Sequence, residues 1–79
     1  MFFIYVLRSL KDGNRYIGCT EDVQARLKRH NAGQVRATRP RRPFELIYWE
    51  QQATWAEARQ RENFLKSGQG RAWLATQGF

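Results

Sequence analysis

The sequence predicts a small α+β fold, in which helices flank a three-stranded antiparallel sheet in the order β-β-α-β-α-α. Three observations support this prediction. Residues 2–7 are a continuous apolar run, Asp12-Gly13 is a hairpin turn signal, and two helix-start patterns follow near residues 20 and 54. Seventy-nine residues without a composition shift or linker predict a single domain over residues 1–79.

The first predicted element is a β-hairpin. The run at residues 2–7 is rich in β-branched and aromatic side chains and too short for a buried helix, which is typical of a strand covered on both faces. Asp12-Gly13 favours a two-residue turn, after which residues 16–18 return as the second strand.

The turn also predicts which side chains share a face of the hairpin. A two-residue loop places Thr20 opposite Tyr5 and Gly18 opposite Leu7. Because side chains alternate along a strand, Tyr5, Tyr16, Gly18 and Thr20 would share one face. The glycine would then leave open space beside two phenol hydroxyls, which suits the floor of a site.

A helix is expected over residues 21–32. Thr20 is its expected N-cap, and the two acidic residues after it would lie in the first turn, where the helix dipole favours negative charge. Val23 and Leu27 mark its buried stripe, and Gly33 is a natural stop.

A basic loop over residues 33–43 and a third strand over residues 44–49 should follow, with Pro43 suiting a strand start. Strict alternation predicts two sets of side chains on opposite faces of this strand: Phe44, Leu46 and Tyr48 on one, and Glu45, Ile47 and Trp49 on the other.

Thr54 and Glu57 have capping-box spacing, so a second long helix should begin at Trp55. Residues 67–70 are expected to break it, and residues 71–76 to form a short last helix whose apolar side chains cover the sheet.

Glu62 stands out on the second long helix because it falls where the apolar stripe asks for a core residue. An unpaired buried carboxylate is costly, so Glu62 must be exposed, paired or bound to a cation. An ion pair with Lys66, four residues on, is the simplest solution.

Charge is the strongest global signal. The formal net charge is +7, eleven of the fourteen basic residues are arginine, and seven basic residues but no acidic ones lie from Arg26 to Arg42. Arginine matches phosphate bidentately, so this bias favours a nucleic-acid partner over a merely solvated surface. The basic residues form no long amphipathic helix, which disfavours a membrane surface.

Single Cys19 excludes an internal disulfide and fits a reducing compartment. No basic region precedes the apolar run, and that run is far below the roughly 20 residues needed to span a bilayer. We therefore expect a soluble, cytoplasmic protein that binds no membrane.

Several segments together resemble the GIY-YIG nuclease domain, specifically its small stand-alone bacterial members, which are related to the N-terminal incision domain of the excision-repair nuclease. In order, these segments are Phe3-Ile4-Tyr5, Tyr16-Ile17-Gly18, Arg26, His30-Asn31, Arg41-Arg42-Pro43, residues 61–66 around Glu62, and residues 67–71. The resemblance covers nearly the whole chain. Phe3 departs from it by replacing the glycine of the first motif, while the tyrosine after it is retained.

The resemblance implies metal-dependent hydrolysis of DNA phosphodiester bonds, with repair or recombination as the setting, and catalytic roles for Tyr5, Tyr16, Arg26, His30 and Glu62. Glu62 would hold one Mg²⁺ or Mn²⁺, and Arg26 would stabilise charge on the phosphate. Tyr16 would accept a proton while Tyr5 positions water or phosphate, and His30 would relay a proton or contact phosphate.

The expected partner is DNA, with RNA left open, and a monomer is favoured. The expected nucleic-acid-binding residues are Arg36, Arg39, Arg41, Arg42 and Lys66.

Two alternatives remain at the level of the sequence. The chain is a DNA- or RNA-binding module without catalysis, using the basic run from Arg26 to Arg42, or an interaction domain that recruits a partner through Trp49, Trp55 or Trp73.

Overall fold

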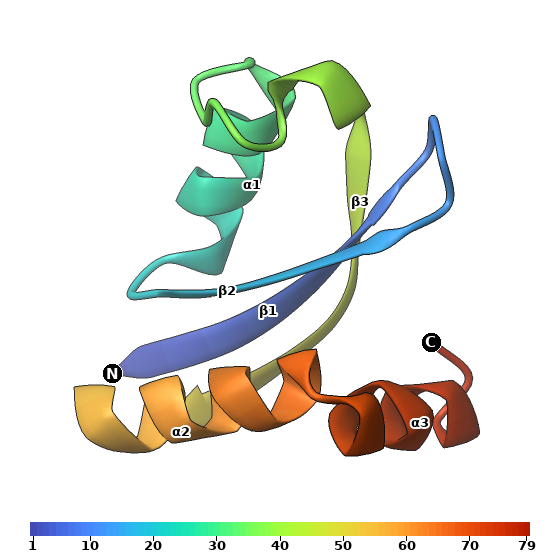
Figure 1. Cartoon of the computed structure of the whole chain (residues 1–79). Helices are drawn as coiled ribbons and strands as arrows, with labels where there is room; N and C mark the ends of the chain where they lie inside the picture. Colours follow the sequence, from blue (N-terminus) through green and yellow to red (C-terminus); the bar gives the residue numbers. More distant parts are fainter.

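The computed structural model describes all 79 residues and confirms the predicted fold class. Its elements are β1 (Phe2–Ser9), β2 (Arg15–Thr20), α1 (Val23–Asn31), a short 3₁₀ helix η1 (Arg39–Arg41), β3 (Phe44–Gln52), α2 (Trp55–Lys66) and α3 (Gly68–Thr76). The antiparallel sheet has the order β2-β1-β3, with α1 on one side and α2 and α3 along the other (Figure 1). None of the helices combines the length and apolarity needed to cross a bilayer.

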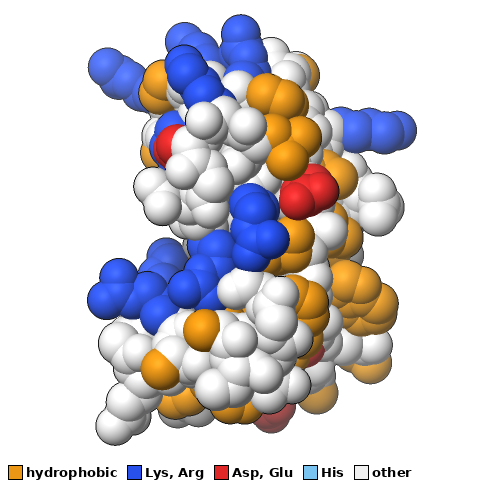
Figure 2. Space-filling model, turned by 90° about the vertical axis from the view of Figure 1, so that its right-hand side faces the viewer, with side chains coloured by type: hydrophobic (Ala, Val, Ile, Leu, Met, Phe, Trp, Pro, Cys, Tyr) orange, Lys and Arg blue, Asp and Glu red, His pale blue; other side chains and the backbone are white.

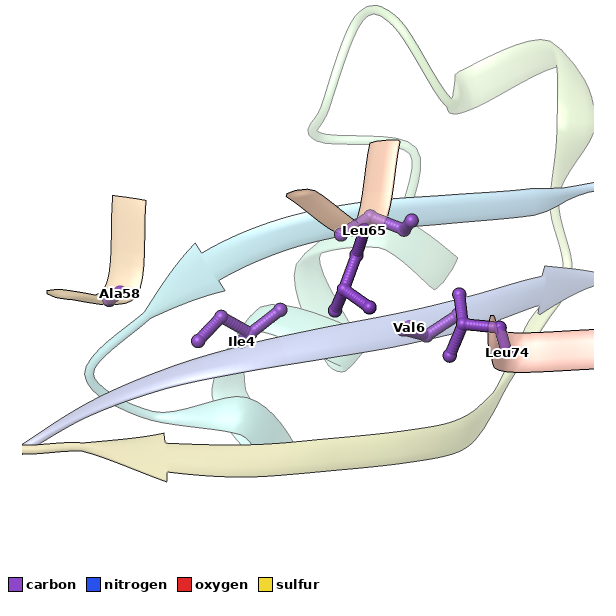
Figure 3. Packing of buried hydrophobic residues seen from close by; sticks show 6 residues of the cluster. Ile4, Val6, Ala58, Leu65 and Leu74 are labelled. Atoms are coloured by element: carbon purple, nitrogen blue, oxygen red, sulfur yellow. The ribbon is translucent and has the colours of Figure 1, made fainter. Parts of the chain in front are cut away.

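The central strand β1 is covered on both faces, as its continuous apolar run predicts. Ile4 and Val6 pack against Leu65 and Leu74 from α2 and α3 (Figure 3). On the opposite face, Tyr5 and its neighbours form a second small core below α1. The two faces of one strand therefore carry separate clusters, and only the second includes predicted site residues.

The predicted hairpin register is wrong by two residues, while the predicted sharing of faces is confirmed. Tyr5 pairs with Gly18, and Leu7 pairs with Tyr16. The loop spans residues 10–14 and not two residues. The Ser9 hydroxyl stabilises this longer loop, because it accepts hydrogen bonds from the backbone N–H groups of Lys11 and Asp12, at 3.1 Å each. An even shift leaves every side chain on its predicted face.

A β-bulge in β3 overturns part of the predicted alternation. Val6 pairs with Tyr48 but Leu7 pairs with Leu46, so Ile47 is an extra residue in β3. The bulge turns Tyr48 toward α3 and puts Trp49 on the Tyr5 side of the sheet, the reverse of the prediction for both residues.

Helix α1 begins two residues later than expected. Asp22, not Thr20, is its N-cap, accepting a hydrogen bond from Ala25 N at 3.0 Å, so the first turn holds no acidic residue. Gly33 follows its end with a φ of +77°, as a helix stop requires. The side chain of Asn31 then ties α1 to β3, accepting from Phe44 N at 2.7 Å and donating to Phe44 O at 3.1 Å.

Helix α2 begins at Trp55 as predicted, with Thr54 Oγ1 accepting from Glu57 N at 3.1 Å. Ser67 ends α2 and also caps α3, so the last helix begins at Gly68, earlier than expected. A Cβ at Gly70 would collide with the backbone of α2, so a glycine lets α3 turn closely against α2.

Candidate active site

Tyr5, Arg26 and His30 converge below α1. Tyr5 comes from the central strand, and the other two lie one helical turn apart on α1. The Tyr5 hydroxyl lies 2.9 Å from His30 Nε2, and Arg26 Nε donates to the same hydroxyl at 3.4 Å. Tyr5 and His30 are 1% and 0% exposed, whereas Arg26 is half-buried and reaches the surface.

Thr38 completes this cluster, and no sequence pattern points to it. Its Oγ1 lies 2.7 Å from His30 Nδ1 and donates to Val35 O at 3.4 Å. We assign the tautomer from these contacts: with the Thr38 hydroxyl donating to Val35 O, His30 Nδ1–H donates to Thr38 and Nε2 accepts the proton of Tyr5. The hydrogen bonds therefore run in one direction, from Arg26 through Tyr5, His30 and Thr38 to a backbone carbonyl.

Burial keeps the inner groups neutral. It lowers the pKa of His30 to about 4, helped by the positive charges of Arg26 and Arg29. Burial also raises the pKa of Tyr5 above its ordinary value, and this outweighs the opposing hydrogen bond from Arg26. Near pH 7, Tyr5 is a hydrogen-bond donor to a neutral imidazole, so the pair positions Arg26 rather than carrying charge.

The open space predicted beside Gly18 is occupied. An ideal Cβ at Gly18 would lie 2.6 Å from Tyr5 Oη and 2.7 Å from Cζ. The register explains the difference, because Tyr5 sits directly opposite Gly18 and not two residues away. The glycine makes room for the phenol ring itself.

Tyr16 is the freer of the two phenols. Its ring lies 6.4 Å from that of Tyr5 and 5.0 Å from that of His30, centroid to centroid. It is half-buried, and its hydroxyl has no hydrogen-bond partner within the protein. Of the two predicted tyrosines, Tyr16 is therefore the one whose hydroxyl remains available.

Glu62 approaches the same edge of the sheet from the other layer. It lies on α2, where its carboxylate accepts from Cys19 Sγ at 3.2 Å. Cys19 follows Gly18 on β2, which is an edge strand. After burial and the charge of Tyr16, the charge of Glu62 also raises the pKa of Tyr5. The structure therefore gathers four predicted residues on one face and sets Glu62 behind β2.

The simplest solution for Glu62, an ion pair with Lys66, is confirmed at 2.9 Å. Arg59 Nε also lies 3.4 Å from the Glu62 carboxylate, and the Glu62 side chain is 12% exposed. No group of three or more His, Cys, Asp or Glu side chains could enclose a metal ion. A lone carboxylate fits Mg²⁺ or Mn²⁺ only where water and substrate phosphate supply the remaining oxygen ligands.

Two of the four arginines of the basic loop are already held by polar contacts within the protein. Arg41 pairs with Asp12 at 2.9 Å and lies over the Phe44 ring. Arg39 Nε donates to Gly33 O at 2.7 Å, and Arg42 covers the same glycine. Arg36 is exposed and has no partner, so it is the loop arginine freest to meet a ligand.

The tryptophans differ in exposure. Trp49 and Trp55 are 52% and 45% exposed, whereas Trp73 is half-buried below Arg61. Trp49 lies beside Phe3 and borders an apolar hollow of about 350 Å³ next to the start of α1. Trp49 and Trp55 are therefore accessible to a partner protein, whereas Trp73 is less so.

Residues 1–73 match the GIY-YIG catalytic domain, so the chain belongs to the GIY-YIG family of nucleases. Within that family it is similar to small proteins. It is 41% identical over 66 residues to the UPF0213 proteins of Staphylococcus aureus strains Mu50 and N315, covering 82% of this chain and 79% of each relative. The solution structure of the UPF0213 protein from Bacillus halodurans is similar, with a TM-score of 0.58 and 33% identity, covering 98% of this chain and 85% of that one.

Proposed function

We propose that this protein is a metal-dependent endonuclease that hydrolyses phosphodiester bonds in DNA. The observation that carries the proposal is the Arg26 guanidinium, whose Nε donates to the buried Tyr5 hydroxyl at 3.4 Å, while the ring of Tyr16, with its unpartnered hydroxyl, lies 6.4 Å from the ring of Tyr5. A fixed cation next to an unpartnered phenol is a suitable arrangement for binding a phosphate and activating a water molecule.

Arg26 binds and polarises the phosphate. Its Nε is committed to Tyr5, and its two terminal nitrogens have no partner within the protein. Those nitrogens can donate to two non-bridging phosphate oxygens, the bidentate geometry that arginine provides and lysine does not. Because Tyr5 and His30 hold the guanidinium in place, little reorganisation is needed as negative charge develops.

In this proposal Tyr16 reacts as the phenolate, which takes the proton of the attacking water and becomes the neutral phenol. Tyr5 is unsuited to that step, because it is 1% exposed and its own proton is held by His30. His30 is 0% exposed, so it acts through Tyr5 and not by touching phosphate. This assigns positioning to the buried pair and proton transfer to the phenol at the surface.

Glu62 would hold one Mg²⁺ or Mn²⁺ through a hard oxygen, after its carboxylate leaves Lys66 and Arg59. When bound, the cation supplies Lewis-acid polarisation of the phosphate and stabilises the leaving oxygen. Lys66, once displaced from Glu62, remains nearby to neutralise the DNA backbone.

The test is cleavage of supercoiled, branched and single-stranded DNA with Mg²⁺, Mn²⁺ or EDTA. Branched DNA represents repair and recombination intermediates. Arg26→Lys retains charge but lacks the fork, so it should lose at least about a hundredfold in rate, the low end for one lost transition-state donor. Glu62→Gln should abolish cleavage, whereas Glu45→Gln, a matched change at an exposed position, should not. Equal cleavage by Glu62→Gln and wild type would refute the assignment of Glu62 as the metal ligand. No cleavage by the wild type would refute the proposed nuclease activity.

A second candidate function is nucleic-acid binding without hydrolysis. It is favoured by the Glu62 carboxylate, which is shared by Lys66, Arg59 and Cys19 and belongs to no group of three or more His, Cys, Asp or Glu side chains. This candidate predicts that Mn²⁺ leaves NMR signals near Glu62 unbroadened while DNA still binds. Selective broadening of those signals would refute it.

A further inference from the structure

A basic hollow lies on the β2 side of the molecule, outside the Tyr5 cluster. It has a volume of about 220 Å³ and is lined by Arg15, Tyr16, Ile17, Lys66 and Arg71. Three of the five side chains are cationic, and none is acidic. In Figure 2, Lys and Arg side chains form a band across the middle of the face shown, with others at its upper end. This is the electrostatic character expected of a site for a phosphate group.

The cations of this hollow differ in how firmly they are held. Arg15 donates to the main-chain oxygens of Arg71 and Phe79 at 3.4 and 3.2 Å, which fixes its side chain against the last helix. The Arg71 side chain is exposed and has no hydrogen bond or ion pair. Arg71 is therefore the cation of this hollow that a ligand gains without breaking an existing contact.

The hollow shares one residue with the candidate active site. Tyr16 belongs to both, because it lines the hollow and packs against His30 with ring centroids 5.0 Å apart. Lys66 links the hollow to Glu62 through their ion pair of 2.9 Å. A group bound in the hollow would thus lie against Tyr16, the phenol that also packs beside the buried Tyr5–His30 pair. By contrast, Arg39 and Arg41 of the basic loop are already held by hydrogen bonds within the protein.

We propose that this hollow is a phosphate subsite, which binds the backbone phosphate adjacent to the one held by Arg26. The inference rests on the proposed function in taking a DNA strand as the substrate. Arg71 and Lys66 bind the phosphate oxygens, and Arg15 supports the wall from behind. The strand then passes over the β2 edge beside Tyr16, rather than over the loop of residues 33–43.

Arg71→Ala tests the subsite, with binding of a labelled oligonucleotide measured by fluorescence anisotropy in EDTA over a range of salt concentrations. Because Arg71 is exposed and unpartnered, its loss should not affect folding, which thermal unfolding checks. We expect affinity to fall about tenfold, the effect of one charge-assisted hydrogen bond. The slope of log K against log salt should fall by about 0.9 on duplex DNA. Arg71→Glu should weaken binding further.

Lys11→Ala is the matched control. Lys11 has the same charge, lies exposed in the hairpin loop and lines none of the hollows. Its removal should leave the salt slope within error of the wild type. If Arg71→Ala and Lys11→Ala behave alike, the binding is that of a general basic surface and the subsite is refuted.

Inorganic phosphate distinguishes a strand from a free anion as the source of the phosphate group. The oligonucleotide should shift the amide NMR signals of Tyr16, Lys66 and Arg71 at a concentration well below that of inorganic phosphate. Equal potency of the two would refute the strand assignment. Since these measurements use EDTA, a wild type that never cleaves DNA would refute the proposed enzyme while leaving the altered Arg71→Ala slope as evidence for the subsite.

Discussion

The phenol ring of Tyr5 lies over the backbone of Gly18, its direct partner between β1 and β2. An alanine Cβ at position 18 would come within 2.6 Å of the Tyr5 hydroxyl, so the ring must move and its hydrogen bond to His30 must weaken. We expect Gly18→Ala to lower the free energy of unfolding by about 1–3 kcal/mol, the usual cost of overpacking. Urea denaturation measures it. Gly68→Ala is the control, because nothing lies within 4 Å of its Cβ, and equal stability of the two variants would contradict the prediction.

The neutral His30 makes stability depend on pH. Its pKa falls from 6.5 in the unfolded chain to about 4 in the folded protein, so the unfolded chain binds more protons between those values. Stability should be complete above pH 6.5 and fall as the pH drops toward 4, by about 3 kcal/mol. Asp12, whose pKa is lowered by its hydrogen bond from Arg41, changes the stability only below about pH 4, outside the range in which His30 titrates.

NMR of the single histidine gives this pKa directly. Urea denaturation at several pH values should show a weaker dependence in His30→Gln. A His30 that titrates near 6.5 in the folded protein would contradict the buried, neutral imidazole.

We expect the hydroxyl of Thr38 to contribute to the stability of the folded protein. Thr38→Val keeps the shape of the side chain but leaves His30 Nδ1–H without its partner at 2.7 Å. Loss of a buried hydrogen-bond partner costs about 1–3 kcal/mol of unfolding free energy. Thr38→Ser keeps the hydroxyl and should lose less. Thermal or urea unfolding measures both variants, and equal stability of Thr38→Val and Thr38→Ser would contradict the prediction.

Cys19 should be an unreactive thiol. Burial, followed by its hydrogen bond to Glu62, raises the pKa of Cys19 to about 12 from 9.0. At pH 8 the folded protein should react with iodoacetamide about a thousandfold more slowly than the unfolded chain, because the thiolate is the nucleophile. Glu62→Gln removes the negative charge and should speed alkylation, whereas Glu45→Gln should not. Equal rates in these two variants would place Glu62 away from Cys19.

The parts of the fold that the sequence predicts well depend on local signals. The capping box of Thr54 and Glu57 defines the start of α2, and the apolar run of β1 requires cover on both faces. The predicted hairpin register is wrong because the Ser9 hydroxyl organises a longer loop, through hydrogen bonds that no sequence spacing indicates. The bulge at Ile47 is not predictable in this way, because the alternation of side chains in β3 gives no sign of an extra residue.

The same division holds for the candidate site. Strand alternation and the helical period are enough to bring Tyr5 and Tyr16 to one face and Arg26 and His30 to one stripe of α1. The contacts of His30 with Thr38 and of Glu62 with Cys19 join segments that no periodicity relates. Such contacts depend on how the helices dock on the sheet, which only the three-dimensional structure gives.

Tyr5 belongs to the small core below α1 and to the candidate site at once. Removing its ring would therefore open a cavity as well as release Arg26, and loss of activity would be confused with loss of folding. For the proposed nuclease, an inactive but intact variant for crystallography with an oligonucleotide is better made at Arg26, which is only half-buried. Because the Tyr5 ring serves both the core and the candidate site, an inactivating substitution should be made at Arg26 and not at Tyr5.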